Sequence, residues 1–328
     1  MTRRVDQINL ALILRLFIDL KKFKGTVSIA VPGSILDNAQ SLELRTYLAG
    51  QIARAAAVFC VDEVIVFDEA AKTTEKELKL FDETASIAFE GSKPNCNFLL
   101  ARLLQYLETP QYLRKQLFPL QKELKFAGLL NPLDCPHHLR SNEITIPYRE
   151  AVVLSKPTKE GKGSFCDAGL SKEVQIDRQL EPGIRVTVEI KEFDFSRKKL
   201  KARVVSPSEP RSRDYYWGYQ VRLAKSLSDV FDGCPYPSGY DCTIGTSERG
   251  TDIEQLEHFS SSNHVLVVFG GLSGLESCLE NDQHLTADSP SQLFDRYVNT
   301  CPNQGSRTIR TEEAVLITLS ALRPKLKI

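Results

Sequence analysis

Residues 264–276 read HVLVVFGGLSGLE, an apolar run followed directly by a glycine-rich turn. Two similar arrangements flank it in the chain: residues 243–250 read TIGTSERG, and residues 303–313 read NQGSRTIRTEE after another short apolar run. Each apolar run has the length and composition of a strand, and the last loop leads into an expected helix over 311–322. We therefore predict an α/β sheet that carries three glycine- and hydroxyl-rich loops at neighbouring strand ends, where open α/β sheets bind ligands.

The three loops suit a flexible ligand that has both apolar and polar parts. Glycine lets backbone groups approach a ligand closely, and the neighbouring Leu272, Leu275 and Ile309 have the character of an apolar pocket for an adenine. No G-x-x-x-x-G-K-[ST] is present, and the glycine loops come last in the chain. A P-loop enzyme or an early Rossmann-type turn is therefore disfavoured. The alternative is that these glycines only serve ordinary turns.

Charge and cysteine content narrow the function classes. The chain has 328 residues with 42 lysines and arginines against 42 carboxylates, so its net charge is zero. No global basic field indicates a nucleic-acid partner, although a local basic face is compatible with this total. The eight cysteines are scattered without a C-x-x-C pair. We expect reduced, mostly buried thiols in an intracellular protein of the nucleus or cytoplasm.

Residues 1–24 are predicted to form a leader, either an amphipathic helix or a loosely ordered segment. Their apolar run is interrupted by Arg15 and Asp19, and it is too short to cross a bilayer. No membrane association is expected.

The N-terminal half, 25–117, has the pattern of a βαβ unit. A short apolar strand over 26–31 is followed by a helix that Asp37 or Asn38 caps, and then by a second strand over 61–67. The polar segment 69–94 is interpreted as a mobile surface loop.

Residues 118–207 have a different texture, with frequent prolines and little helical periodicity. Short strand-like runs predict a small antiparallel barrel inserted into the α/β fold; these runs are 151–154, 173–176, 184–190 and 200–205.

The α/β pattern returns over 208–328. Its predicted strands are 215–221, 240–244, 264–269 and 296–300. The aromatic residues Tyr215, Tyr216, Trp217 and Tyr219 are suited either to stacking on bases or to packing in the core. The sequence leaves both interpretations open.

Charged side chains beside the loops are candidates for chemistry. Arg249, Arg307 and Arg310 could bind phosphate or orient a nucleophile. A solvated face or pairing with a nearby carboxylate is the alternative, and Glu312 could simply match the dipole of the last helix. The sequence Cys135-Pro136-His137-His138 lacks further ligands nearby, so no metal is expected.

Several segments together resemble one family, the SPOUT class of RNA methyltransferases. The resemblance runs from about residue 26 to 323 and is carried by VSIAVPGSILDNAQS (27–41), TIGTSERG (243–250), VVFGGLSGLE (267–276) and YVNTCPNQGSRTIRTEEAVLITLSAL (297–322). It implies an α/β sheet whose C-terminal segment is tied in a deep trefoil knot, an OB-like inserted barrel, and a homodimer with RNA as substrate. It also implies S-adenosyl-L-methionine as cofactor and S-adenosyl-L-homocysteine as product.

The resemblance assigns roles to residues of this chain. It implies that Arg249, Arg310 and Glu312 are catalytic, and that Arg45 and Arg307 contact substrate. The implied cofactor-binding residues are Gly245, Thr246, Ser247, Phe269, Gly270, Gly271, Leu272, Gly274, Leu275, Glu276, Gln304, Gly305, Ser306, Ile309, Thr311 and Ala314.

Two functions remain open at this point. The first is an S-adenosylmethionine-dependent enzyme that methylates an oxygen or nitrogen of RNA. The second is a cofactor- and RNA-binding scaffold acting mainly in mitosis, with spindle or kinetochore proteins as partners, because one branch of the family carries a centromere-protein alias.

Overall fold

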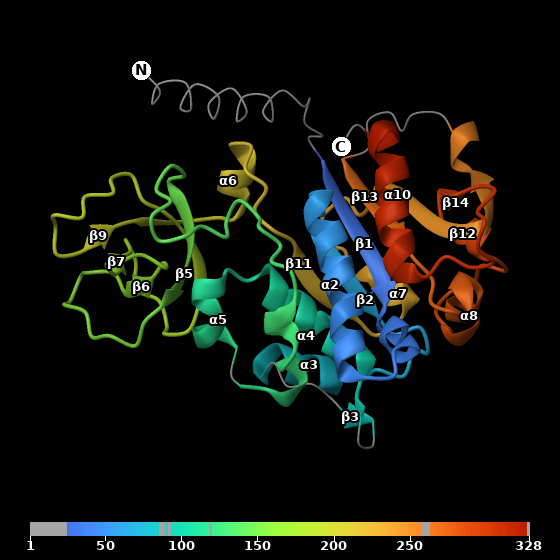
Figure 1. The fold of residues 1–328 in the computed structure, drawn as a ribbon, viewed down its shortest axis with the longest axis horizontal. Helices are drawn as coiled ribbons and strands as arrows, with labels where there is room; N and C mark the ends of the chain where they lie inside the picture. Colours follow the sequence, from blue (N-terminus) through green and yellow to red (C-terminus); the bar gives the residue numbers. More distant parts are fainter. Residues whose placement is uncertain (1–24, 85–88, 91–92, 119, 257–262, 327–328) are drawn as a thin grey trace.

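The computed structural model describes residues 25–84, 89–90, 93–118, 120–256 and 263–326. The predicted leader 1–24 lies outside these residues. A parallel sheet with helices on both faces fills one end of the molecule, and a smaller sheet lies at the other end of the longest axis (Figure 1). In the part of the chain that the structure describes, no helix is both long and apolar enough to span a membrane.

The larger sheet is parallel throughout its six strands, in the order β11-β2-β1-β13-β12-β14. Its central strands are fully buried on both faces, which explains why their sequences are continuous apolar runs. The strands are β1 (Thr26–Pro32), β2 (Glu63–Phe67), β11 (Gln220–Ala224), β12 (Cys242–Asp252), β13 (His264–Val268) and β14 (Arg296–Asn299).

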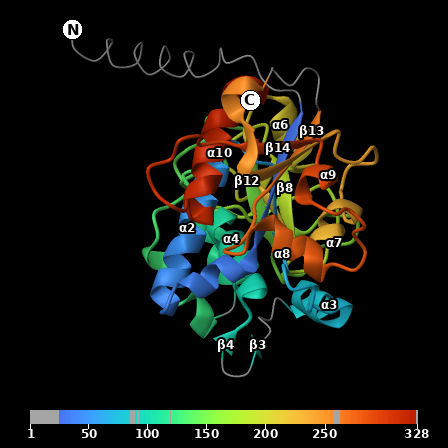
Figure 2. The same ribbon diagram turned by 90° about the vertical axis from the view of Figure 1, so that its right-hand side faces the viewer.

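Helices cover both faces of this sheet, as the turned view in Figure 2 shows. The first layer holds α2 (Leu42–Val58), α4 (Cys96–Glu108) and α10 (Thr311–Leu326), and the second holds α7 (Leu227–Asp232), α8 (Gly274–Asn281) and α9 (Pro290–Leu293). Successive side chains of β1 pack against opposite layers, because Ile29 and Val31 belong to the first core cluster and Ala30 to the second.

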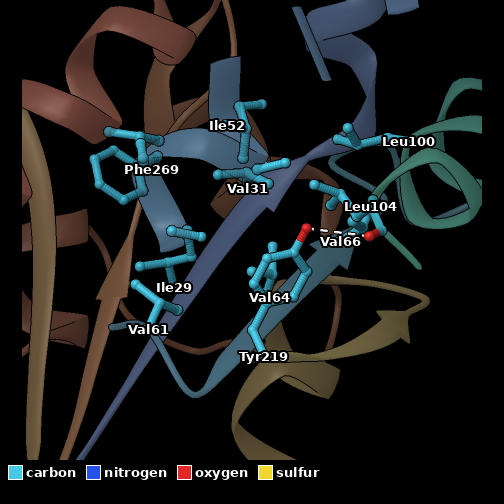
Figure 3. Close-up of a cluster of buried hydrophobic side chains, with 14 of the residues drawn as sticks. Ile29, Val31, Ile52, Val61, Val64, Val66, Leu100, Leu104, Tyr219 and Phe269 are labelled. Carbon is cyan, nitrogen blue, oxygen red and sulfur yellow. Dashed lines mark hydrogen bonds between the residues drawn. The ribbon is translucent and has the colours of Figure 1, made fainter. Parts of the chain in front are cut away.

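The close-up in Figure 3 shows how side chains of the sheet pack against the helices of the first layer. Val64 and Val66 of β2 meet Leu100 and Leu104 of α4, and all four side chains are fully buried. The Tyr219 hydroxyl donates a hydrogen bond to the Leu104 carbonyl at 3.1 Å. The aromatic run 215–219 therefore packs as core, and the predicted strand there is wrong: strand β11 begins only at Gln220.

Two further predictions for the N-terminal half need correction. A 3₁₀ helix occupies Gly33–Asn38, and Ser41 caps α2 by accepting from Leu44 N. The segment 69–94 contains α3 (Glu75–Thr84) and a small hairpin, β3 (Phe89–Glu90) with β4 (Lys93–Pro94), in place of a loop. The helix α5 (Gln111–Leu117) then leads toward the insert.

The insert contains a second six-stranded sheet, in the order β10-β8-β5-β6-β7-β9. All its pairs are antiparallel except β7 with β9. The strands are β5 (Tyr148–Val153), β6 (Phe165–Asp167), β7 (Val174–Gln175), β8 (Arg185–Glu189), β9 (Leu200–Lys201) and β10 (Arg203–Val205). The end strands β9 and β10 are separated only by Ala202, so one short segment forms both edges of the sheet. The short helix α6 (Ser208–Ser212) leads back to β11.

Buried ion pairs join the insert to the larger sheet. Arg185 of β8 contacts Glu108 of α4 at 2.7 Å and Glu150 of β5 at 2.5 Å. His137 Nε2 lies 2.9 Å from the other Glu108 oxygen, and Trp217 Nε1 donates to Glu150 at 2.7 Å. Charges this well paired and this buried fix the relative placement of the groups that carry them.

Candidate functional site

The three predicted loops meet at the carboxyl ends of β12, β13 and β14, which are adjacent in the sheet. The loop after β13 turns at Gly271–Gly274 and enters α8. The segment 300–310 returns from β14 to α10, where the Thr311 hydroxyl donates to the Gly270 carbonyl at 2.9 Å. The Thr311 hydroxyl therefore joins the third loop to the second.

The first loop differs from the prediction in one respect. Strand β12 continues to Asp252, but its pairing with β14 jumps from Thr246 to Thr251, and both residues face Val298. The intervening residues bulge out of the ladder. The bulge is held at two points: Asn299 Nδ2 donates to the Glu248 carbonyl at 3.0 Å, and the Thr246 hydroxyl donates to the Val268 carbonyl at 3.1 Å.

Most loop glycines are explained by close packing. A Cβ at Gly245 would lie 2.4 Å from a Phe294 ring carbon, and one at Gly270 would lie 2.8 Å from the Gly274 backbone. Gly274 itself has φ +75°, a conformation that favours glycine. Gly305 differs, because nothing lies within 4 Å of the space that its Cβ would fill. The open side of the site is therefore at the third loop.

A groove of about 790 Å³ opens beside the third loop, between α2 and α10. Gln304, Gly305 and Ile309 line one side, and Tyr47 and Gln51 of α2 line another. The buried Glu312, at the start of α10, also lines it. An apolar groove with a few polar groups is the usual form of a cofactor or partner site.

The predicted charged residues separate in the structure. Arg249 is exposed and pairs with Glu276 at 3.2 Å, while Tyr297 donates to the same carboxylate at 3.5 Å. Burial and the nearby Glu276 carboxylate raise the pKa of Tyr297, so it stays a neutral donor. Arg307 and Arg310 are exposed on the third loop. The Arg310 backbone N–H, just before α10, donates to the Glu313 carboxylate at 3.0 Å, as in a capping box.

Arg45 does not fit the role that the resemblance implied. It is only 8% exposed, and its guanidinium binds the Ala39 carbonyl at 3.2 Å and Asp37 at 3.1 Å. It therefore ties the 3₁₀ turn to α2 and cannot reach a substrate or a second copy without unpacking.

Residues that the sequence analysis missed also border the loops. Glu69 follows directly after β2, and its carboxylate packs against Gly271: a Cβ at Gly271 would lie only 2.3 Å from Glu69 Oε2. Tyr47 and Gln51 were missed because their helix is far from the loops in the chain. Tyr297 lies inside a predicted strand, where neither spacing nor composition indicates that its hydroxyl contacts Glu276.

The candidate ligand atoms of Cys135, His137 and His138 all lie within 4.8 Å of one another. Both histidines place Nε2 on the Glu108 carbonyl oxygen, at 3.0 and 2.6 Å. Burial lowers the pKa of His138 to about 3 and raises the pKa of the Cys135 thiol to about 12. The three side chains belong to the packing between α4 and the 130–140 segment. The described cysteines form no disulfide, and five of the eight are buried, as predicted.

Comparisons with known proteins are consistent with this geometry. A family model described as "Putative RNA methyltransferase" matches residues 26–322. The chain is 56% identical over 308 residues to a human 28S rRNA (uridine-N(3))-methyltransferase, covering 92% of this chain and 78% of that protein. It is 54% identical over 306 residues to the Drosophila melanogaster protein of the same name, covering 92% of this chain and 63% of that one. It thus spans about two thirds to three quarters of the length of these relatives.

More distant matches bear similar names. A Caenorhabditis elegans protein named as the methyltransferase spot-1 is 42% identical, with 91% of this chain and 80% of that protein covered. A solved SpoU methyltransferase, AviRb from Streptomyces viridochromogenes with AdoMet bound, aligns at 11% identity and a TM-score of 0.28, covering 92% of this chain and 57% of that one. A score this low supports no structural argument.

Proposed function

Because the chain belongs to the family of RNA methyltransferases whose model matches residues 26–322, we propose that it transfers a methyl group from S-adenosylmethionine to N3 of a uridine in large-subunit ribosomal RNA. The 54–56% identity to relatives named for that reaction carries the proposal. The scaffold alternative is not favoured, because none of these names refers to a centromere, a spindle or a kinetochore.

The three loops are suited to hold the cofactor. The space beside Gly305 is open, and Ile309 supplies an apolar wall on the same loop. Backbone groups of the Gly270–Gly274 turn and the third loop would bind the polar edges of an adenine and its ribose. When bound, the cofactor supplies an electrophilic methyl group on a sulfonium.

The remaining work falls to side chains of this chain. N3 of uridine carries a proton that a base must remove. The N3 lone pair then bonds to the methyl carbon, and the bond between that carbon and the sulfonium sulfur breaks. Glu312 is the proposed base, since its carboxylate lines the groove and is largely shielded from water. Arg307 and Arg310, exposed on the adjoining loop, would hold RNA phosphates and orient the uracil base. Arg249, which pairs with Glu276, is proposed to take part in catalysis.

Two finer features of the fold are also proposed. The contact of Thr311 with Gly270 brings the start of α10 back across the sheet from β14, which supports a knotted C-terminal segment. The shared segment around Ala202, which pairs with β7 on one side and β8 on the other, supports a closed, OB-like barrel in the insert.

A homodimer through the α2–α10 face is proposed as well. Four apolar side chains on or beside this groove are about half exposed, namely Leu44 at 54%, Tyr47 at 56%, Val58 at 52% and Leu316 at 49%. Because such contiguous apolar surface is uncommon on a monomer, a second copy is the simplest cover for it.

The first experiment measures binding and transfer together. Purified chain is titrated with S-adenosylmethionine and then incubated with radiolabelled cofactor and total ribosomal RNA. Saturable binding with label entering large-subunit RNA supports the proposal. Binding without label in any RNA would leave only the non-catalytic alternative.

A further inference from the structure

Two loops of the insert gather positive charge. Residues 155–163 and 191–201, here called the basic loops, contain eight lysines and arginines against three carboxylates, in a chain whose net charge is zero. They meet at Phe165 of β6: Lys156 Nζ lies 4.9 Å and Lys199 Nζ 5.1 Å from its ring centroid. The two loops therefore form one surface.

Much of this charge is not neutralised within the chain. Arg197 pairs with Glu192 and Asp194, and Lys156 pairs with Glu173. Among the described residues, no carboxylate forms an ion pair with the other exposed lysines of the surface, which are Lys159, Lys162, Lys191, Lys198 and Lys201. A hollow of about 290 Å³ lies on the same surface, and its charged lining residues are Lys191, Arg197, Lys199, Lys201 and Arg203 against Glu189, Glu192 and Asp194. Exposed lysines without a carboxylate partner, on a surface that also carries an aromatic ring, favour a polyanion with phosphates at regular spacing.

We propose that the basic loops bind the phosphate backbone of the RNA substrate, at a part of the RNA remote from the methylated nucleotide. The proposal rests on the proposed function, which makes RNA the polyanion. The insert and the strands β12 and β14 lie at opposite ends of the longest axis (Figure 1). A nucleotide at the cofactor loops therefore cannot also lie on Phe165, and only a longer RNA reaches both.

The pairs of Arg185 with Glu108 and Glu150 allow RNA bound at the insert to be positioned at the distant loops. They hold the insert in one orientation relative to α4, so RNA bound at one end is placed in a defined position at the other. Phosphate contacts of this kind set register and affinity without reading sequence.

The test compares two double variants and two RNAs. Lys198→Glu with Lys201→Glu reverses two unpaired charges without touching the lysines packed on Phe165. Lys76→Glu with Lys79→Glu is the control, because both lysines are exposed on α3, outside the insert. The RNAs are a long transcript of the large-subunit region and a short oligonucleotide around the target, and S-adenosylmethionine binding is measured in parallel.

We expect the insert variant to bind the long transcript about 10-fold or more weakly, with a log–log salt slope smaller by about 1 to 2. Its turnover of the short oligonucleotide and its affinity for S-adenosylmethionine should equal those of the wild type. Unchanged binding of the long transcript, or an equal loss with both RNAs, would overturn the proposal. If the wild type itself methylates no RNA, the proposed function fails, whereas a binding defect confined to the insert variant would still support the surface.

Discussion

The glycines of the three loops illustrate how one residue type occupies two kinds of surroundings. Gly245 is needed because Phe294 occupies the position of its Cβ, whereas Gly305 has open space there. The sequence alone presents both as glycines in loops. Only the packing around each one separates a structural requirement from an open ligand site.

Alanine at these two positions forms a matched pair. Gly245→Ala is expected to destabilise the protein by about 1–3 kcal/mol through overpacking against the Phe294 ring. Gly305→Ala should leave the melting temperature unchanged and weaken S-adenosylmethionine binding, because its methyl group fills the proposed pocket. Thermal melts and calorimetric titration measure both effects. A destabilised Gly305→Ala with normal cofactor affinity would contradict this assignment.

Glu312 and Glu313 offer a second matched pair at the start of α10. Glu312→Gln should lower kcat by about 10²–10⁴-fold, the range for loss of a general base, with unchanged cofactor affinity. Glu313→Gln removes the same charge from the helix terminus, but Glu313 is exposed where Glu312 is buried, and its carboxylate accepts from the Arg310 amide. Its kcat should stay near the wild-type value. Equal losses in the two variants would point to the helix terminus instead of a base.

Among the elements, the central strands were predictable and the polar segments were not. Continuous apolar runs identify β1, β2 and β13, because a parallel strand buried on both faces requires them. The helix α3 was missed since its polar residues conceal a short amphipathic pattern. The aromatic run at 215–219 was misassigned because bulky residues favour strands in general, while here Trp217 and Tyr219 fill the joint between two parts of the fold.

The contact between the insert and α4, where Arg185 and His137 pair with Glu108, yields a pH-dependent prediction. Burial alone would raise the pKa of Glu108, but Arg185 and His137 outweigh it and hold that pKa well below its ordinary value of 4.5. The ion pair therefore stabilises the fold fully above about pH 4.5, and this stability declines progressively as the pH falls from there toward the much lower pKa of Glu108 in the folded protein. Glu108→Gln should cost about 3–5 kcal/mol at neutral pH, since it leaves Arg185 poorly paired.

Urea unfolding between pH 7 and 3 checks this prediction. The wild type should lose stability more steeply than Glu108→Gln below pH 4.5, so that the two curves converge. Parallel curves across the whole range would show that the Glu108 charge does not stabilise the joint.

For the whole molecule, the sequence indicated the order of the two α/β halves and the insert along the chain. It did not indicate how the edge strands of the second sheet pair. The change in texture near residue 118 predicted where the insert begins, and the three loops were expected to be neighbours. That the 200–205 segment forms both edges of the second sheet depends on pairings distant in the chain, which local patterns do not encode. Arg45 failed for a related reason: its burial against Asp37 and Ala39 is a tertiary property.

The dimer is tested at the same scale. Tyr47→Glu with Leu316→Glu places two charges on the exposed apolar face between α2 and α10. We expect the wild type to sediment as a dimer and this variant as a monomer with reduced methyl transfer. Analytical ultracentrifugation decides between them, and a monomeric wild type with full activity would rule out the proposed interface.

The most direct test of the central claim maps the product. Large-subunit ribosomal RNA from cells that lack the protein is incubated with the purified chain and S-adenosylmethionine, and modified nucleosides are located by mass spectrometry. The account predicts N3-methyluridine at a defined uridine, absent without the protein and restored by it. Restoration of no methyl group, or of a methyl group on a different atom, would contradict it.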